Sequence, residues 1–237
     1  MHSAAPASRP KALLFDLDDT LWPIGPVIAQ AEITLHAWLA AYAPKVAQQF
    51  SIETLRRERL ALLAREPQLQ LDLGQLRRAG LRAAFAQAGE DPSKVEAAMQ
   101  HFFAARNAVT PYPDVLPGLA SLKGSVLLGS ISNGNADLEA IGMAHHFQVS
   151  LAAARFGRAK PDAAIFHAAC AGLGVAPREA VYVGDDLLLD VAAAQNAGLR
   201  AVWLNRSAVP LDEGIRPDAI CASFDELLGW FDRQLEE

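Results

Sequence analysis

The stretch that decides the fold is ALLFDLDDT, residues 12–20. It begins with four apolar residues, Ala12 to Phe15, and turns acidic at once, with aspartates at positions 16, 18 and 19. A short continuous apolar run is typical of a β-strand that is buried on both faces, as in a parallel sheet. The sequence therefore predicts a first strand whose carboxyl end carries Asp16 and Asp18.

Further apolar runs follow later in the chain and alternate with segments of helical spacing. We expect strands at 12–15, 126–131, 149–153, 180–183, 200–204 and 219–221. We expect helices between them at 166–173 and 191–197, each followed by glycine. This alternation predicts an α/β fold with a doubly wound parallel sheet, that is, a Rossmann-like core.

A purely helical segment separates the first predicted strand from the second. Apolar residues at helical spacing predict helices at 28–42, 52–64 and 75–88, and a fourth from Asp91 through Phe103. Four helices in a row without a strand predict a helical-bundle cap inserted into the core. The predicted organisation is a tail at 1–10, a catalytic core at 11–23 and 112–237, and a cap domain at 24–111.

Composition excludes several classes of protein. The 237 residues are 51% hydrophobic and carry a net charge of −6, which allows a sizeable core but no broad positive field for nucleic acid. No apolar run reaches the roughly 18 residues that a membrane span needs. Cys170 and Cys221 form no CxxC pair, so we interpret both as buried small hydrophobes in a reducing, cytoplasmic protein. We expect a monomer or a homodimer, with no nucleic-acid or membrane partner.

Polar residues follow three of the predicted strands. In open parallel sheets ligands bind beyond the carboxyl ends of the strands, so these clusters should converge. Convergence would crowd negative charges together, and an all-oxygen cluster without His or Cys favours a hard cation, with Mg²⁺ the first choice. The acidic residues of this candidate site are Asp16, Asp18, Asp185, Asp186 and Asp190.

The first cluster has the residues that group transfer requires. Asp16 and Asp18 are two positions apart, so on an extended backbone both point to the same side, where one can act as nucleophile while the other transfers protons. Lys160 precedes Pro161 and is expected in a loop. Lys160 and the Ser132 hydroxyl suit the outer oxygens of a phosphoryl group.

Four short motifs in one order resemble the haloacid dehalogenase superfamily. The resemblance covers the chain from about Lys11 to Arg206, and a helical cap between the first two motifs is a known arrangement of that family. The motifs are DxDxT at 16–20, Ser132-Asn133-Gly134, Lys160-Pro161, and GDxxxxD at 184–190.

The resemblance implies catalytic roles for three residues. Asp16 would attack phosphorus and become a transient aspartyl phosphate. Asp18 would protonate the leaving oxygen and then deprotonate the hydrolytic water. Lys160 would offset charge on the nucleophile and the phosphoryl group.

The resemblance also implies the binding groups. The substrate-binding set comprises Ser132, Asn133, Thr20 and Lys160, with the Thr20 hydroxyl supporting the loop. Mg²⁺ would be held by the Asp16 carboxylate, the Asp18 backbone carbonyl and Asp185. Asp186 or Asp190 would act on the metal directly, through water, or through Lys160.

The implied function is a Mg²⁺-dependent phosphatase that acts on a small phosphorylated metabolite, with the cap closing over the site and setting specificity. The stretch FDLDDTLWPIGPV, with the GRxKP and VGDDxxxDV contexts, resembles bacterial flavin mononucleotide phosphatases, so that nucleotide or a sugar phosphate is the expected substrate. The alternatives are a phosphomutase, a haloacid dehalogenase, and a catalytically silent binding module. Asp18 disfavours the dehalogenase, because those relatives lack it.

Two features outside the motifs leave alternatives open. Trp22 follows the first motif and either stacks on a substrate ring or packs the cap hinge. A set of cap arginines either forms a solvated helix face or reaches an anionic substrate. That set comprises Arg56, Arg57, Arg59, Arg77, Arg78 and Arg82.

Overall fold

The chain folds into two compact units. In the computed structural model, residues 9–211 and 214–234 are described. One unit comprises Met1–Pro23, Thr110–Asn133 and Gly142–Glu237, and the other Ile24–Val109 and Gly134–Ile141. The expected tail at 1–10 lies, up to residue 8, outside the described residues. The segment 134–141 groups with the helical unit, whereas the sequence analysis places it in the core.

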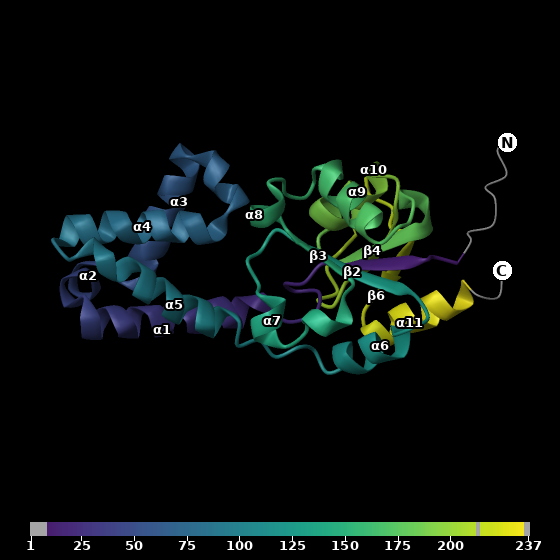
Figure 1. Cartoon of the computed structure of the whole chain (residues 1–237), viewed down its shortest axis with the longest axis horizontal. Coiled ribbons are helices and arrows are strands. Elements are labelled where there is room, and N and C mark those ends of the chain that lie inside the picture. Colours follow the sequence, from purple (N-terminus) through teal and green to yellow (C-terminus); the bar gives the residue numbers. More distant parts are fainter. Residues whose placement is uncertain (1–8, 212–213, 235–237) are drawn as a thin grey trace. The chain divides into compact units, whose positions relative to one another are not determined.

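The first unit is built on a six-stranded sheet in the order β3-β2-β1-β4-β5-β6 (Figure 1). Every pair of neighbouring strands is parallel. The doubly wound α/β prediction is therefore confirmed. The strands are β1 (Ala12–Phe15), β2 (Leu127–Ser132), β3 (Val149–Ala152), β4 (Ala180–Gly184), β5 (Arg200–Leu204) and β6 (Ala219–Cys221).

The register of the sheet determines which residues leave it together. Phe15 of β1 lies opposite Ser130 of β2 and Val183 of β4. The Asp16 N–H then donates to the Val183 carbonyl at 2.9 Å. The chain runs from β1 through β2 to β3. It then crosses to the other side of β1 and continues through β4, β5 and β6, so the direction of winding reverses between β1 and β4. Ligands bind at such a reversal, beyond the carboxyl ends of the strands.

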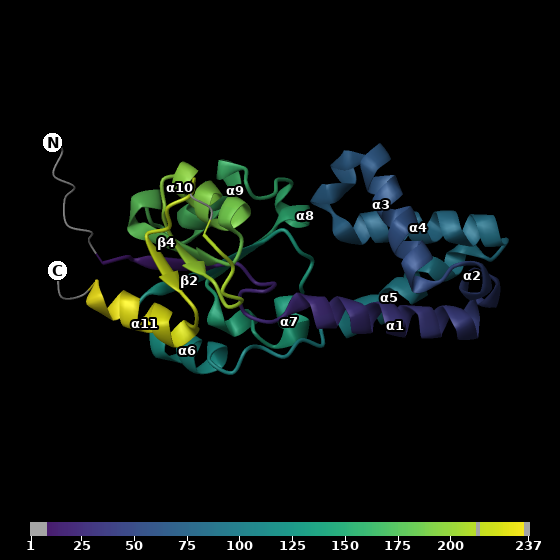
Figure 2. The same ribbon diagram turned by 180° about the vertical axis from the view of Figure 1, so that it is seen from behind.

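Helices cover both faces of this sheet. The views in Figures 1 and 2 agree that α6 and α11 lie side by side on one face and that α9 and α10 lie on the other. The sequence analysis assigns no helix to α6 or α11, although the Ser223 side chain caps α11 by accepting from the Glu226 N–H. The helices and shorter turns are α6 (Val115–Leu122), η3 (Ala144–His146), α8 (Ala153–Phe156), α9 (Ala163–Gly172), η4 (Pro177–Glu179), η5 (Leu187–Ala192), α10 (Ala193–Asn196) and α11 (Phe224–Arg233).

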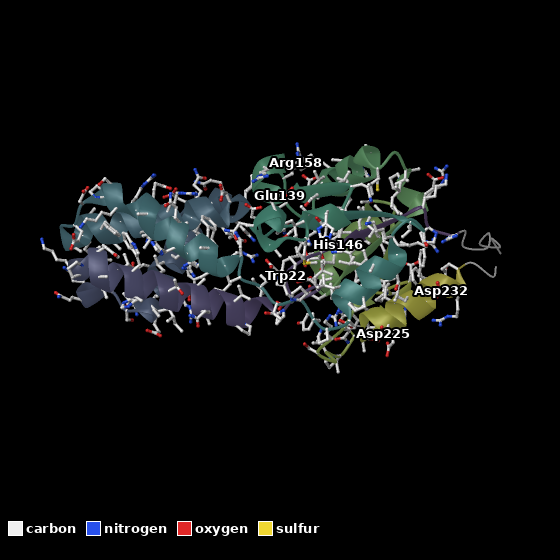
Figure 3. The ribbon with its side chains drawn as sticks, turned by 60° about the horizontal axis from the view of Figure 1, so that its bottom comes forward. Trp22, Glu139, His146, Arg158, Asp225 and Asp232 are labelled. Atoms are coloured by element: carbon white, nitrogen blue, oxygen red, sulfur yellow. The ribbon has the colours of Figure 1, made fainter. Side chains whose placement is uncertain are left out.

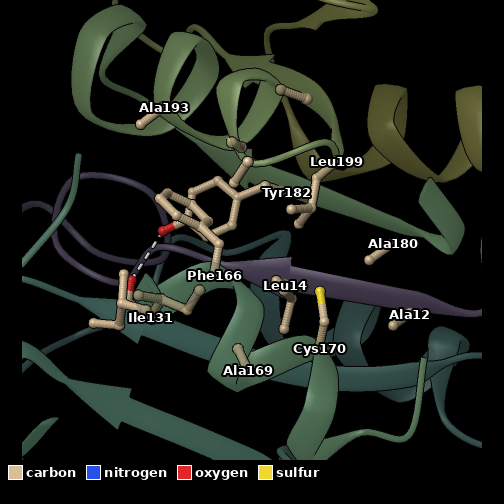
Figure 4. Close-up of a cluster of buried hydrophobic side chains, with 14 of the residues drawn as sticks. Ala12, Leu14, Ile131, Phe166, Ala169, Cys170, Ala180, Tyr182, Ala193 and Leu199 are labelled. Atoms are coloured by element: carbon tan, nitrogen blue, oxygen red, sulfur yellow. Dashed lines mark hydrogen bonds between the residues drawn. The ribbon is translucent and has the colours of Figure 1, made fainter. Parts of the chain in front are cut away.

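The face beneath α9 and α10 buries a continuous apolar cluster (Figure 4). Leu14 and Ile131 contribute from the central strands, and Phe166 contributes from α9. Burial of each such side chain contributes about 1.5–3 kcal/mol, so this cluster holds the central strands in place. Cys170 and Cys221 are both buried and free, as expected, and burial raises the pKa of each thiol to about 11.

The second unit is helical. Its elements are α1 (Ile24–Tyr42), α2 (Pro44–Gln49), α3 (Ile52–Arg65), η1 (Pro67–Leu71), α4 (Leu73–Ala88), η2 (Pro92–Lys94), α5 (Val95–Arg106) and α7 (Leu138–Ile141). The short helix α2, which begins at Pro44, is additional to the four predicted helices of this segment. Gly89 ends α4 with a φ of 65°, as the predicted C-terminal stop requires. No helix among the described residues is both long and apolar enough to cross a membrane.

Three of the cap arginines pair with one buried carboxylate. Arg56, Arg59 and Arg77 converge on the carboxylate of Glu32 in α1, with contacts of 2.5, 3.0 and 3.3 Å. Glu32 is only 3% exposed and Arg77 only 9%. Burial and the neighbouring Arg59 lower the pKa of Arg77 to about 10. The sequence analysis misses this cluster because Glu32 comes from a helix 24 or more residues away from its partners.

Candidate active site

The centre of the candidate site is the contact between Asp16 and Lys160. Asp16 follows β1 directly, Lys160 comes from the loop before α9, and both are buried. The Lys160 Nζ donates to Asp16 Oδ1 at 2.5 Å and to Asp190 Oδ1 at 2.6 Å. A third bond, of 2.9 Å, runs from the same nitrogen to the hydroxyl oxygen of Tyr182. Residues that are 144 positions apart in the chain therefore meet in one buried cluster.

These three bonds use all the protons of the Lys160 ammonium group. In this structure the lysine therefore orients Asp16, and it contacts a phosphoryl oxygen only by exchanging one of the three bonds. Burial disfavours the charged lysine, but the charges of Asp16 and Asp190 outweigh it and hold its pKa well above the usual range. Burial raises the pKa of Asp16 well above its usual range, with the charges of Asp190 and Asp185 acting in the same sense.

Asp185 brings a further carboxylate to this cluster from the end of β4. Its Oδ1 accepts a hydrogen bond of 2.9 Å from the Thr20 hydroxyl. Burial and the charge of Asp190 raise the pKa of Asp185 to about 6. Thr20 itself is fully buried, so its hydroxyl holds the loop and Asp185 together, which is the supporting role and not that of a substrate contact.

Carboxylate oxygens of Asp16, Asp185 and Asp190 lie within 4.8 Å of one another. Three carboxylates face one ammonium group here, which leaves an excess of negative charge in a buried position. A divalent cation would offset that excess, and an all-oxygen donor set suits a hard ion. The residues present therefore fit a Mg²⁺ site.

Asp190 and Asp186 are placed differently from each other. Asp190 is buried; its Oδ1 accepts from Lys160 and its Oδ2 from the Asp186 N–H, at 3.0 Å. Of the alternatives left open, Asp190 acts on Lys160. Asp186 is exposed, and its Oδ1 caps η5 by accepting from the N–H groups of Leu188 and Leu189, at 2.8 Å each. Asp186 is not one of the three carboxylates in this group, and its metal role stays a prediction.

Asp18 follows Asp16 by two positions and is half-buried. Its Oδ1 accepts a hydrogen bond of 2.8 Å from the indole Nε1 of Trp22. Trp22, which is labelled in Figure 3, is 0% exposed, so its ring packs within the protein and does not stack on a substrate. The indole thereby fixes the orientation of the Asp18 carboxyl.

Ser132 and Asn133 close the cluster at the end of β2. Ser132 is the last residue of β2 and is buried. The side-chain amide of Asn133 binds the backbone of Lys160 twice, donating to its carbonyl at 2.9 Å and accepting from its N–H at 2.8 Å. Asn133 therefore positions Lys160, and its side chain is committed to that task.

The contribution of Tyr182 and the steric reason for Gly184 are not predicted from the sequence. Tyr182 is fully buried in β4; its hydroxyl accepts from Lys160 and donates to the Ile131 carbonyl at 2.9 Å, as the dashed line in Figure 4 marks. Gly184 must lack a side chain, since a Cβ there would lie 2.3 Å from Asp190 Oδ2. The sequence signal for Tyr182 is a tyrosine inside the otherwise aliphatic strand β4, because a buried hydroxyl needs a hydrogen-bond partner.

Comparison with known proteins agrees with this geometry. The model of the haloacid dehalogenase-like hydrolase family matches residues 10–198. The chain is 34% identical over 208 residues to the 5-amino-6-(5-phospho-D-ribitylamino)uracil phosphatase YigB of Escherichia coli K12, covering 86% of this chain and 87% of that protein. It is 36% identical over 151 residues to a phosphoserine phosphatase of Thermus thermophilus, covering 61% of each chain.

A solved structure shares the whole fold. A 2-haloacid dehalogenase from Pseudomonas syringae pv. Tomato DC3000 superimposes with a TM-score of 0.88 at 37% sequence identity. The superposition covers 94% of this chain and 99% of that one. The names of these relatives thus specify two reactions, hydrolysis of a phosphate ester and dehalogenation.

Proposed function

The chain belongs to the haloacid dehalogenase-like hydrolases, in their phosphatase branch, and on that premise we propose that it hydrolyses a small phosphate monoester through an aspartyl phosphate on Asp16. The chain is thus a phosphoric monoester hydrolase, and the proposal concerns its mechanism, metal and substrate. The observation that carries it is the buried contact of Asp16 with Lys160, with a second aspartate, Asp18, two positions further along the chain.

Asp16 is the nucleophile of the proposed first step. A carboxylate oxygen of Asp16 forms a bond to phosphorus while the bond from phosphorus to the ester oxygen breaks. The leaving oxygen takes a proton from Asp18, whose carboxyl is oriented by Trp22. The products of this step are the free alcohol and an acyl phosphate on Asp16.

Asp18 reverses its role in the second step. Now a carboxylate, it takes a proton from a water molecule, and the water oxygen bonds to phosphorus. The bond from phosphorus to the Asp16 oxygen breaks, which releases inorganic phosphate and restores the Asp16 carboxylate. Lys160 holds that carboxylate in place in both steps, supported by Asp190 and Tyr182.

Mg²⁺ would be held by the carboxylates of Asp16 and Asp185 and by the Asp18 backbone carbonyl. When bound, it neutralises charge on the phosphoryl oxygens and on the carboxylates around them. Thr20 keeps Asp185 in position through its hydroxyl.

We assign the substrate to the phosphate esters of small polyols and sugars. The name of the E. coli relative, which covers most of this chain, specifies a 5-phosphoribityl group on an aminouracil ring. The short motifs of the sequence resemble flavin mononucleotide phosphatases, and flavin mononucleotide also carries a phosphoribityl group. Ribityl phosphates are therefore the first substrates to test.

Haloacid dehalogenation is the second candidate, favoured by the likeness to the P. syringae structure. Asp18 argues against it on chemical grounds. A halide leaves as a stable anion and needs no proton, whereas an alkoxide leaving group does. An aspartate held by an indole N–H beside the nucleophile is of use for the ester and of none for the halide.

The test compares the wild-type protein with Asp16→Asn. Phosphate release from flavin mononucleotide, ribitol 5-phosphate and p-nitrophenyl phosphate, and halide release from 2-chloropropionate, are measured with Mg²⁺. We expect the wild type to release phosphate and not halide. In Asp16→Asn the rate of phosphate release should fall at least about 10³-fold, while the far-UV circular dichroism spectrum stays unchanged. Halide release without phosphate release, or an active Asp16→Asn protein, would refute the proposal.

A further inference from the structure

A pocket of about 260 Å³ opens in the sheet-containing unit, next to the acidic cluster. It lies where β1, β4 and β5 end, since its lining includes Asp19, Asp185 and Arg206. Asp185 also belongs to the carboxylate group around Asp16. The pocket therefore borders the place where the phosphoryl group would react, and it is large enough for the carbon skeleton of a small ester.

The cationic residue in this lining, Arg206, is paired with a carboxylate. Arg206 donates through Nη1 to Asp114 at 3.0 Å and through Nε to the Thr20 carbonyl at 3.0 Å. Its guanidinium group lies over the ring of Tyr112, 4.1 Å from the ring centre. The charge of Arg206 is thus paired with Asp114, and its side chain forms a wall of the pocket.

Two carboxylates line the pocket, and Asp19 is the one that lies outside the acidic cluster around Asp16. Asp19 is exposed, and its backbone lies in the left-handed region, with a φ of 63°. Its N–H donates a hydrogen bond of 2.7 Å to the Trp22 carbonyl. Burial and then the charge of Asp19 raise the pKa of Tyr112, which also lines the pocket. The remaining lining includes the exposed Ser207 and Val209, a hydroxyl and an apolar side chain.

We propose that this pocket seats the leaving group of the substrate and that Asp19 selects uncharged, hydroxyl-bearing leaving groups over those that carry a carboxylate. The inference rests on the proposed phosphatase function and adds to it a residue that determines specificity. Hydroxyl groups of a polyol can donate to Asp19, while Val209 contacts its carbon chain. A carboxylate in the same place meets a like charge, which weakens its binding in both the ground and the transition state.

The experiment compares leaving groups that differ in charge. The value of kcat/KM is measured for ribitol 5-phosphate, with an uncharged leaving group, and for phosphoglycolate and phosphoserine, whose leaving groups carry a carboxylate. The variant is Asp19→Asn, because asparagine removes the charge and tolerates the left-handed backbone conformation. The control is Asp232→Asn, which removes the same charge from the exposed end of α11, away from Trp22 in Figure 3.

We expect the wild type to prefer ribitol 5-phosphate, and Asp19→Asn to raise kcat/KM for the two carboxylate substrates about tenfold relative to ribitol 5-phosphate. Asp232→Asn should leave this ratio unchanged. Ser207→Lys, at an exposed position, places a cation in the pocket and should shift the ratio in the same direction even if Asp19→Asn folds poorly.

The outcomes separate the inference from the function on which it rests. A ratio that stays the same in both Asp19→Asn and Ser207→Lys, or a wild type that prefers the carboxylate substrates, overturns the selection by Asp19 and leaves the phosphatase function standing. The absence of Asp16-dependent phosphate release from every ester overturns the function itself.

Discussion

Lys160 shows how much of this site depends on contacts among its own residues. Its ammonium group is held by three acceptors, Asp16, Asp190 and Tyr182, and its backbone by the amide of Asn133. A lysine with a free side chain would sample many rotamers, at a cost of up to about 2 kcal/mol on each ordering. The fixed lysine instead keeps the Asp16 carboxylate in one orientation before any substrate arrives.

Tyr182→Phe tests this arrangement. The change leaves one Lys160 proton and the Ile131 carbonyl without their partner, both in buried positions, so we expect a loss of about 1–3 kcal/mol in the free energy of unfolding. We expect kcat to fall more than KM rises, since the loosened lysine orients the nucleophile and not the leaving group. Urea denaturation and steady-state kinetics provide the two measurements.

The matched control is Tyr42→Phe. Tyr42 is 59% exposed in α1, so removal of its hydroxyl should change neither stability nor kcat. A Tyr182→Phe protein with the kcat of the wild type would show that the tyrosine supports only the packing of β4.

At the scale of the elements, the helical unit is held together by charge as well as by apolar packing. Glu32 of α1 receives Arg56 and Arg59 from α3 and Arg77 from α4, so one carboxylate joins three helices. None of the residues of α3 is fully buried, whereas α4 buries Leu81 and Phe85. The ion cluster therefore adds to the contacts of half-buried apolar residues such as Leu55 in holding α3 to the rest of the unit.

Glu32→Gln should destabilise the protein by about 3 kcal/mol at pH 7, because it leaves the buried Arg77 without its counter-ion. Burial opposes ionisation of Glu32, but hydrogen bonds from Arg56 and Arg59 and the charge of Arg77 hold its pKa below the usual value of 4.5. A lowered acid pKa stabilises the folded state above the unfolded pKa, and this stabilisation is lost as the pH falls through the folded pKa.

The measurement is the difference in unfolding free energy between the wild type and Glu32→Gln, from urea curves at pH 7 and pH 3.5. We expect a smaller difference at the lower pH. Glu139→Gln, at an exposed position of α7 shown in Figure 3, should produce no difference at either pH. A pH-independent difference would indicate that Glu32 acts through packing and not through charge.

The elements also show what a sequence can and cannot predict. The strands at 12–15, 200–204 and 219–221 are predicted to the residue, because each is a short, mostly apolar run with a polar residue directly next to it, as Asp16 follows Phe15. The acids beyond Phe15 and Gly184 follow from the same rule. The contacts of Tyr182 and Glu32 do not, since each depends on partners that only the folded chain brings near.

At the scale of the whole molecule, part of the net charge of −6 lies in the buried carboxylate cluster of the candidate site. The carboxylates of Asp16, Asp185 and Asp190 face the single ammonium of Lys160, a charge imbalance that is unfavourable in a buried site. The fold that brings these residues together is therefore stabilised by whatever cation binds there. Catalysis and stability should depend on the same ion.

Removal of the metal tests this coupling. Treatment with EDTA should abolish phosphate release, and Mg²⁺ should restore it. Mg²⁺ at about 100 times its Kd should raise the free energy of unfolding by about 2.7 kcal/mol, because an ion that binds only the folded state stabilises it by mass action.

Asp185→Asn removes one of the repelling charges together with a ligand, so the metal-free variant should be at least as stable as the metal-free wild type. Its Mg²⁺-dependent shift in Tm should be largely lost. A variant that is less stable than the wild type without metal, and still responds fully to Mg²⁺, would place the ion away from Asp185, and the acidic cluster would then need another explanation.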